Sequence, residues 1–167
     1  MKLYKNKFRV ETVRLKDWDY STPCWYYITV CTKDKKHWFG EVKNGEMILN
    51  KPGKIAEEMW NDITNHYNSI TLDNFIIMPN HIHGIIIINF VETGHAPSVQ
   101  PAKHTLGNVI GSFKSAVSKS IRKNGNIDFN WQPRFYDHII RNENDLHRIR
   151  KYIELNPLKW ELDEYYS

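Results

Sequence analysis

The sequence predicts an α+β fold in which a mainly antiparallel sheet is packed by helices on one face. Two observations carry this prediction: strand-like and helix-like segments are interleaved along the chain, and at least one pair of strands is joined by a hairpin turn. The length of 167 residues is a third, because a single domain typically holds roughly 100–200 residues. A chain of this size can bury enough apolar surface to fold around one core without stabilisation by disulfides or metals.

A lead-in, a strand and a hairpin come first. Residues 1–23 are polar and end in a proline, so we expect an extended segment there. Residues 24–32 are aromatic and β-branched, a composition that favours a strand. Asn44-Gly45 lies between the apolar runs 38–42 and 46–49, and Asn-Gly in this setting is the strongest short signal of a β-hairpin.

A helix and two strands are predicted next. The helix begins at a Pro-Gly pair, carries an apolar stripe from Ile55 to Ile63 and ends near Tyr67. Strands follow at 70–78 and 81–90, separated by a Pro-Asn pair. The unbroken run of isoleucines in the second strand is typical of a central strand that is buried on both faces.

The rest of the chain predicts a loop, two helices and a short strand. Glycine and prolines make 91–104 a loop or flap. Apolar residues at helical spacing predict a helix over 106–122, and a short strand follows at about 135–139. Asn142 is a suitable N-cap for a last helix, which Pro157 ends.

Composition restricts the class of protein. With 41% hydrophobic and 25% charged residues, the chain is neither disordered nor collagen-like. No apolar run approaches the ~18 residues of a membrane span, and no apolar segment follows the basic start, so we expect neither a membrane protein nor a signal peptide. Cys24 and Cys31 lack Cys-x-x-Cys spacing, which favours reduced thiols and a cytoplasmic location.

The net charge of +4 is unevenly distributed along the chain. Residues 103–160 hold 11 basic and 5 acidic side chains, an excess of +6. Such a basic segment suits a surface that faces phosphates. On charge alone, however, a solvated helix face explains the excess better.

His81 and His83 form the sharpest local motif. Side chains alternate along a strand, so both imidazoles point to one face and Ile82 points to the other. Two adjacent imidazoles are half of a divalent-metal site. A His-x-His pair also occurs by chance on ordinary sheets, but this pair lies between a Pro-Asn turn and a rigid apolar strand, which favours a functional role.

Tyr152 and Asn156 are four residues apart and share a face of the last predicted helix. They flank the buried stripe that Ile149 and Ile153 provide. A tyrosine hydroxyl can act as a nucleophile, and an Asn side-chain oxygen is a neutral ligand for Mg²⁺ or Mn²⁺. The alternative is structural: Tyr152 packs at the edge of the core, and Asn156 caps the helix before Pro157.

Basic and aromatic residues are interleaved over 134–141, a pattern that suits phosphate contact and base stacking. The alternative is an amphipathic strand with charged ends. Basic residues of the last two helices could extend the same surface. The candidate DNA-binding residues are Lys114, Lys119, Arg122, Arg134, Tyr136, His138, Arg141, Arg148 and Lys151.

Three segments of the chain, in order, resemble one family. They are Ile77–Gly84 (IMPNHIHG), Trp131–Arg141 with its RFYDHIIR run, and Tyr152–Pro157 (YIELNP). Together they are similar to the single-tyrosine HUH transposases, and specifically to the branch of REP-associated tyrosine transposases. Each motif alone is weak, but all three in this order are specific, and the resemblance spans about residues 20–160.

This resemblance implies one ferredoxin-like catalytic domain over residues 24–160, between the lead-in 1–23 and an acidic tail at 161–167. Enzymes of this family cut single-stranded DNA, often beside a hairpin. They keep a 5′-phosphotyrosine link and free a 3′ hydroxyl, and a second strand then reverses the link. The implied partner is therefore single-stranded DNA with hairpins, and no membrane is involved.

The resemblance also implies roles for single residues. His81 and His83 match the family's metal-binding pair, for which Mg²⁺ or Mn²⁺ is expected. Tyr152 matches the nucleophile, and Asn156 matches the third ligand, so the expected set has no acidic member. Some relatives are dimers that place the tyrosine in the partner's site, whereas others act as monomers, and a homodimer is left open.

Two other functions remain as alternatives. The first is a non-catalytic module that binds hairpin DNA on the same fold and regulates rather than moves it; for this module Tyr152 is dispensable. The second is a metallohydrolase that activates water with a histidine-bound metal. It would turn over without a covalent intermediate and would survive Tyr152→Phe.

Overall fold

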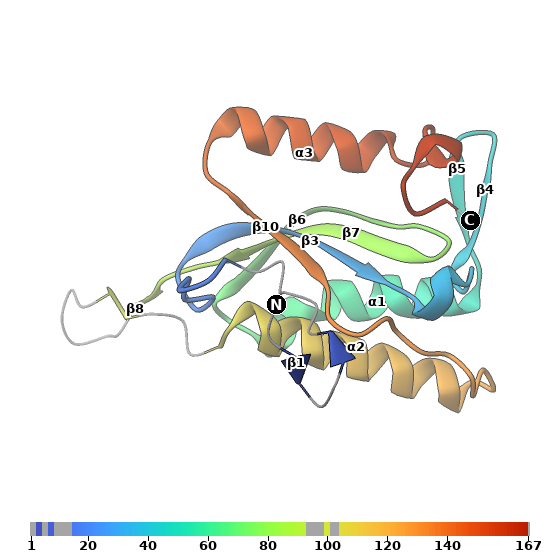
Figure 1. Cartoon of the computed structure of the whole chain (residues 1–167), viewed down its shortest axis with the longest axis horizontal. Coiled ribbons are helices and arrows are strands. Elements are labelled where there is room, and N and C mark those ends of the chain that lie inside the picture. Colours follow the sequence, from blue (N-terminus) through green and yellow to red (C-terminus); the bar gives the residue numbers. More distant parts are fainter. Residues whose placement is uncertain (1–2, 5–6, 9–14, 93–98, 101–103, 167) are drawn as a thin grey trace.

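The computed structural model describes residues 3–4, 7–8, 15–92, 99–100 and 104–166, and its elements are layered around one sheet (Figure 1). The main elements are β3 Cys24–Cys31, β4 Gly40–Lys43, β5 Glu46–Leu49, α1 Lys51–His66, β6 Ile70–Ile77, β7 His81–Ile88, α2 Leu106–Lys123, β10 Tyr136–Ile140 and α3 Glu143–Leu155. The short elements are β1 Leu3–Tyr4, β2 Lys7–Phe8, the 3-10 turn η1 Lys33–Lys35, β8 Val91–Glu92, β9 Val99–Gln100 and the 3-10 turn η2 Trp160–Leu162.

Four strands form one antiparallel sheet in the order β10-β3-β7-β6. Along the chain the elements run β3-α1-β6-β7-α2-β10, which is the βαββαβ arrangement of ferredoxin-like folds. The expected α+β fold is therefore confirmed. Strand β7 lies inside the sheet and all 8 of its residues are buried, which confirms that its isoleucine run marks a central strand.

The helices cover both faces of the sheet, not one face as expected. α1 and α2 lie on one side of it and α3 lies on the other (Figure 1). The cause is visible in β7, where Ile82 and Ile86 belong to the core under α1 and α2, whereas Ile85 packs with Ile149 and Ile153 of α3. Because strand side chains alternate, a strand that is apolar throughout needs a cover on each face.

The core under α1 approaches the sheet closely at Gly84. The indole of Trp60 is fully buried and lies between two other rings, with centroid distances of 5.7 Å to Phe75 and 5.3 Å to Phe113. A Cβ atom on Gly84 would run into the Trp60 ring. The glycine therefore lets helix and sheet approach each other on the side opposite to His83.

The ends of the helices and the hairpin follow the local sequence. Asn50 caps α1 by accepting a hydrogen bond from the Gly53 amide at 3.0 Å, and Asn142 caps α3 by accepting one from the Asp145 amide at 2.9 Å. Strands β4 and β5 pair on either side of Asn44-Gly45, whose φ angles of 53° and 77° are those of a tight hairpin turn. The predicted hairpin and the predicted cap of the last helix are both confirmed.

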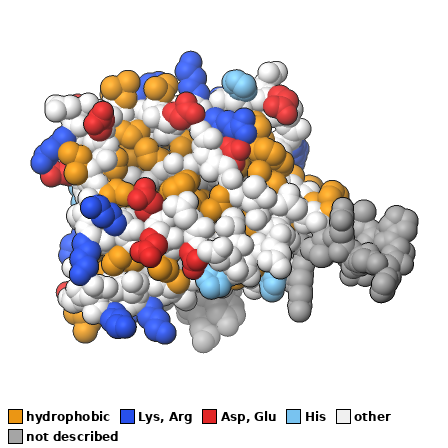
Figure 2. All heavy atoms as spheres, turned by 180° about the vertical axis from the view of Figure 1, so that it is seen from behind, with side chains coloured by type: hydrophobic (Ala, Val, Ile, Leu, Met, Phe, Trp, Pro, Cys, Tyr) orange, Lys and Arg blue, Asp and Glu red, His pale blue; other side chains and the backbone are white. Residues whose placement is uncertain are grey.

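Two segments expected to be irregular contain short paired strands. Strand β1 pairs with β2 inside the expected lead-in, and β8 pairs with β9 inside the expected loop 91–104. Within these segments, residues 1–2, 5–6, 9–14, 93–98 and 101–103 lie outside the described residues. Basic and acidic side chains are interspersed over the side of the molecule shown in Figure 2. Within the described part of the chain, no helix is long and apolar enough to cross a membrane.

Candidate functional site

Strand β7 places His81 and His83 on the α3 face of the sheet. Their rings are fully buried with centroids 4.4 Å apart, while Ile82 between them belongs to the opposite core. The Nε2 atom of each histidine has no hydrogen-bond partner among the described residues. Because buried polar atoms are nearly always paired, two such atoms side by side indicate a place for a ligand.

The second ring nitrogen, Nδ1, has a partner in both histidines. Asn80 Oδ1 lies 2.8 Å from His81 Nδ1, and the hydroxyls of Tyr27 and Thr29 lie 2.8 and 2.9 Å from His83 Nδ1. Burial lowers the pKa of His81 to about 4. Burial also lowers the pKa of His83 well below its ordinary value, and the charge of a protonated His81 lowers it further. Both imidazoles are therefore neutral near pH 7, the form that binds metals.

Helix α3 brings Tyr152 and Asn156 to the same histidines. Ile149 and Ile153 fill the buried stripe of the helix, and the ring centroid of Tyr152 lies 5.2 Å from that of His83. Tyr152 keeps 40% of its surface exposed, whereas Asn156 is buried. A pair on a strand face and a pair on a helix face, each evident from periodicity, thus meet on one side of the sheet.

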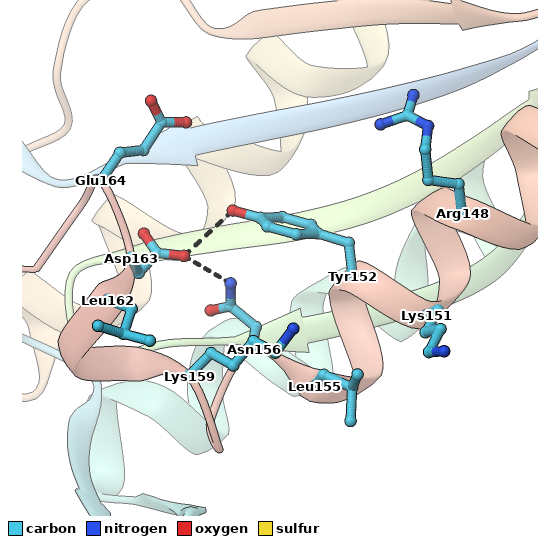
Figure 3. A pocket seen from close by; sticks show the side chains of 9 residues that line it. All are labelled: Arg148, Lys151, Tyr152, Leu155, Asn156, Lys159, Leu162, Asp163 and Glu164. Carbon is cyan, nitrogen blue, oxygen red and sulfur yellow. Dashed lines mark hydrogen bonds between the residues drawn. The ribbon is translucent and has the colours of Figure 1, made fainter.

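The C-terminal segment adds Asp163, a residue that the sequence patterns did not single out. Its Oδ2 atom accepts hydrogen bonds from the Tyr152 hydroxyl at 3.1 Å and from Asn156 Nδ2 at 2.6 Å (Figure 3). One ligand atom each of His81, His83 and Asp163 lie within 4.8 Å of one another. A carboxylate thus lies within reach of the two histidines, whereas the ligand set expected from the sequence has no acidic member and stays a prediction.

Asn156 is a buried polar side chain that contacts Asp163. A carboxylate only accepts hydrogen bonds, so Nδ2 faces Asp163, and Oδ1 is left buried without a partner among the described residues. The site thus combines a carboxylate, an amide oxygen and two unpartnered imidazole nitrogens. Imidazole nitrogens bind divalent metals and oxygen ligands suit Mg²⁺ and Mn²⁺, so the donor set fits a divalent cation.

Tyr165 packs against the histidines from the same C-terminal segment. Its ring centroid is 4.6 Å from that of His81 and 5.6 Å from that of His83. Its backbone oxygen accepts a hydrogen bond from Asn80 Nδ2 at 2.8 Å. The expected acidic tail therefore folds back over the site, as far as the structure describes it.

Sequence spacing could not place this C-terminal segment. It follows Pro157, where helical periodicity stops, and its anchors are far away along the chain. Lys35 Nζ donates to the backbone oxygen of Glu164, 129 positions later, at 3.0 Å. The one sequence signal that could have found Asp163 is its acidic side chain a few residues after the Tyr-Asn pair.

The hydroxyl of Tyr152 is protonated in this arrangement. Burial, the adjacent Tyr27 and the negative charge of Asp163 all raise the pKa of Tyr152 above its ordinary value. A carboxylate that accepts the hydrogen bond of a phenol stabilises the neutral phenol rather than the phenolate. A nucleophilic role for Tyr152 therefore needs a bound cation or substrate to change this environment.

A hollow of about 440 Å³ opens beside Tyr152, between α3 and the C-terminal segment (Figure 3). Its lining residues are Arg148, Lys151, Tyr152, Leu155, Asn156, Lys159, Leu162, Asp163 and Glu164. Three of them are cations and two are carboxylates, so the lining carries a net positive charge of one, which suits an anionic ligand. His81 and His83 are not part of this lining, so an anion in the hollow would meet Tyr152 and Asp163 first.

Three further candidate DNA-binding residues lie near the same face. Tyr136 is 44% exposed on the edge strand β10, and its ring meets Tyr27 edge-on at 6.2 Å. Arg134 and Arg141 are exposed just before and just after this strand. His138 instead joins strand to helix, because its Nε2 atom lies 2.7 Å from Asp145 Oδ2.

The candidates on α2 lie across the sheet from α3, so they do not form one continuous surface with it (Figure 1). Lys114 Nζ donates to the backbone oxygens of Gln132 and Arg134 at 2.7 and 3.0 Å. Arg122 donates through Nε and Nη2 to the backbone oxygen of Phe129. Both side chains therefore hold the segment before β10. Lys119 and Arg122 are exposed, whereas Lys114 is half-buried.

Comparison with known proteins agrees with this fold. No protein-family model matches the sequence. The solved structure of a REP-associated tyrosine transposase bound to a REP hairpin superimposes with a TM-score of 0.63, covering 91% of this chain and 77% of that one at 16% sequence identity. The chain is thus an α+β protein with the fold of a REP-associated tyrosine transposase.

A relative in sequence defines the family. Over 165 residues the chain is 38% identical to an uncharacterized protein of Haemophilus influenzae, covering 93% of this chain and 92% of the relative. The chain therefore belongs to the same family as this Haemophilus influenzae protein.

Proposed function

We propose that this protein is a metal-dependent, transposase-like enzyme that nicks single-stranded DNA beside a hairpin and rejoins ends through a phosphotyrosine link. One observation carries the proposal: two strand histidines, a helix tyrosine and a helix asparagine meet in one place. The fold supports it, since the REP-associated tyrosine transposase with the same fold was solved with a REP hairpin.

His81, His83 and Asp163 would hold the metal, and Asn156 Oδ1 would be a further ligand. Mg²⁺ or Mn²⁺ is the proposed ion. When bound, it would polarise the scissile phosphate and stabilise the charge that develops on the non-bridging oxygens.

Tyr152 would act as the nucleophile of the nicking step. Its Oη atom forms a bond to phosphorus while the bond from phosphorus to the 3′ oxygen breaks. The 5′ phosphate stays on Tyr152, and the 3′ oxygen takes up a proton and leaves as a hydroxyl. Asp163 Oδ2, at 3.1 Å, is placed to accept the phenol proton. Attack by another 3′ hydroxyl reverses the link, so joining needs no ATP.

The DNA strand would lie over α3 and the edge strand β10. Arg148, Lys151 and Lys159 of the hollow would contact phosphates, and Tyr136 would offer a ring for base stacking. Arg134 and Arg141 flank this ring along the strand. Because such contacts release counterions, binding should weaken steeply with salt.

The nicking step needs no residue from a second chain. One copy supplies both the histidines and Tyr152, with ring centroids of His83 and Tyr152 only 5.2 Å apart. We therefore propose that Tyr152 acts in the site of its own chain, whether or not the protein forms a homodimer.

Covalent capture tests the proposed function. The protein is incubated with Mn²⁺ and labelled single-stranded DNA that carries a hairpin from the flanks of its own gene, and the products are separated on denaturing gels. We expect an adduct that disappears with chelator and falls roughly 10³-fold or more in Tyr152→Phe, since the nucleophile is lost. Tyr166→Phe is the matched control, because Tyr166 is an exposed tyrosine like Tyr152 but lies in the C-terminal segment.

Two other results would redirect the assignment. Hairpin binding without cleavage, over several candidate hairpins, would support the non-catalytic regulatory module. Nicked DNA without an adduct, unchanged in Tyr152→Phe, would support a hydrolase that uses metal-activated water.

A further inference from the structure

Asn80 joins three parts of the chain next to the candidate metal site. It precedes the histidine strand and is 1% exposed. Its side chain lies 2.8 Å from His81 Nδ1, 3.1 Å from the backbone oxygen of Lys35 and 2.8 Å from that of Tyr165. Thr32 fixes the backbone of Asn80 as well, because its amide donates to the Asn80 carbonyl oxygen at 2.8 Å.

The two carbonyl contacts decide which way the Asn80 amide faces. A carbonyl oxygen only accepts hydrogen bonds, so the Nδ2 group must face Lys35 and Tyr165. The Oδ1 atom is then left facing His81 Nδ1. Since Oδ1 also only accepts, a hydrogen bond here requires a proton on Nδ1, and neutral His81 then carries its lone pair on Nε2.

We propose that Asn80 is a positioning residue of the metal site, which holds His81 as the Nδ1–H tautomer with Nε2 ready to bind a cation. The inference rests on the proposed function, whose metal it serves. His81 Nε2 is buried next to Asn156 and makes no hydrogen bond of good geometry within the described residues, and a ring nitrogen of His81 lies within 4.8 Å of an Asp163 carboxylate oxygen. Partners of this kind orient a metal-binding histidine and raise its basicity.

His83 provides an internal comparison. Its Nδ1 atom faces the hydroxyls of Tyr27 and Thr29, and a hydroxyl can either donate or accept. These contacts hold the ring but are satisfied by either tautomer. Control of the tautomer by an acceptor-only group therefore concerns His81 alone.

The same amide also holds the segment that carries the acidic ligand. Nδ2 donates to the backbone of Tyr165, two residues after Asp163. Asn80 thus has two separable effects, one through Oδ1 on His81 and one through Nδ2 on the C-terminal segment. Asn80→Asp separates them, because it keeps an acceptor for His81 and removes the donor.

The first test uses the wild-type protein without metal or DNA. In a long-range proton–nitrogen NMR spectrum of protein labelled with ¹⁵N-histidine, we expect His81 to show a protonated Nδ1 and an unprotonated Nε2, with His81→Gln assigning the signals. A proton on Nε2 would overturn the proposal. The tautomer can differ from the expected one in a protein that cleaves DNA, and the expected tautomer can occur in a protein that does not. The two proposals are therefore tested separately.

The second test measures Mn²⁺ affinity by titration calorimetry. Asn80→Ala should weaken binding about 10–100-fold, as the loss of such partners typically does. Asn80→Asp should recover most of this loss, and it should keep the Nδ1–H tautomer. Asn89→Ala is the matched control, because Asn89 follows the other end of β7 and its side chain donates to Thr71 Oγ1 at 2.8 Å.

Equal losses of affinity in Asn80→Asp and Asn80→Ala would overturn the proposal, because only the link to the C-terminal segment would then matter. Thermal unfolding in chelator shows whether each variant is folded. If Asn80→Ala does not fold, the tautomer of the wild-type protein still decides the question.

Discussion

The face of the sheet under α1 and α2 and the face under α3 are built from alternate residues of the same strands. On the first face, strand residues such as Ile28 and Ile86 join a continuous apolar core that includes Trp60 and Phe113. On the second face the buried apolar cluster is smaller, and within the described part of the chain its members are Tyr27, Ile85, Ile140, Leu146, Ile149 and Ile153. Beyond this small cluster lie His81 and His83.

The difference shows how a small domain accommodates buried polar groups. Unpaired polar atoms destabilise a fold by roughly 1–3 kcal/mol each, so they need a stable scaffold elsewhere. Here the continuous core under α1 and α2 supplies that scaffold. The cluster of histidines, Asn156 and Asp163 lies where the short core under α3 ends and the C-terminal segment takes over.

The largest expected effect tests whether the α3 face forms a site within one chain. We expect a mixture of His83→Ala and Tyr152→Phe proteins to form no more phosphotyrosine adduct than either variant alone. The reason is that His83 and Tyr152 meet within one chain, at 5.2 Å. Adduct formation by the mixture, measured on denaturing gels, would mean that two copies share their sites.

Asp163→Asn should weaken Mn²⁺ binding by about 10-fold or more, because the carboxylate is the one negative charge of the described cluster. Glu164→Gln is the matched control, since Glu164 is the next carboxylate along the chain and is not part of that cluster. Titration calorimetry in one buffer compares the two. Similar affinities for both variants would remove Asp163 from the ligand set.

On the opposite face, Gly84→Ala should lower the free energy of unfolding by about 2–3 kcal/mol, the upper part of the range for overpacked cores. The added methyl group meets the Trp60 ring, which is held between Phe75 and Phe113 and cannot move aside easily. Urea denaturation measures the change. An unchanged stability would show that α1 and the sheet can separate without loss.

Acid should destabilise the fold through the buried histidines. Burial lowers the pKa of His81 from 6.5 to about 4 in the folded state. Between pH 6.5 and 4, His81 is therefore protonated in the unfolded chain and neutral in the folded one. Stability therefore falls as pH drops from 6.5 toward 4, by up to about 1.4 kcal/mol per pH unit for one such group. Urea denaturation from pH 7 to 5 should show this slope, and it should be shallower in His81→Gln.

The smallest expected effect is a gain in stability. Gly111 lies within α2, and an added Cβ atom there meets nothing within 4 Å. Gly111→Ala should therefore raise the free energy of unfolding by about 0.5–1 kcal/mol through helix propensity. This change contrasts with Gly84→Ala, where the same methyl group has no space. A loss of stability in Gly111→Ala would show that an unseen contact occupies this helix face.

The spacing of residues along strands and helices predicted which candidate site residues share a face. Turn and capping residues, together with apolar spacing, predicted most of the helices and strands. Alternation along a strand placed His81 and His83 on one face, and a spacing of four placed Tyr152 and Asn156 on one helix face. The charge pattern is harder to interpret. Lys114 stays a predicted DNA contact, and in the structure burial lowers its pKa and its ammonium group donates to two backbone oxygens.

The sequence by itself determined the α+β class, the elements and the two pairs of candidate residues, because repeat spacing and turn chemistry act over a few neighbouring positions. Only the tertiary structure decided that α3 covers the second face, that the two pairs meet, and that Asp163 joins them. Those outcomes depend on contacts between distant positions, such as the hydrogen bond from Asn80 to Tyr165 across 85 positions. No local sequence pattern encodes such contacts, because they form only when helices and strands from distant parts of the chain pack together.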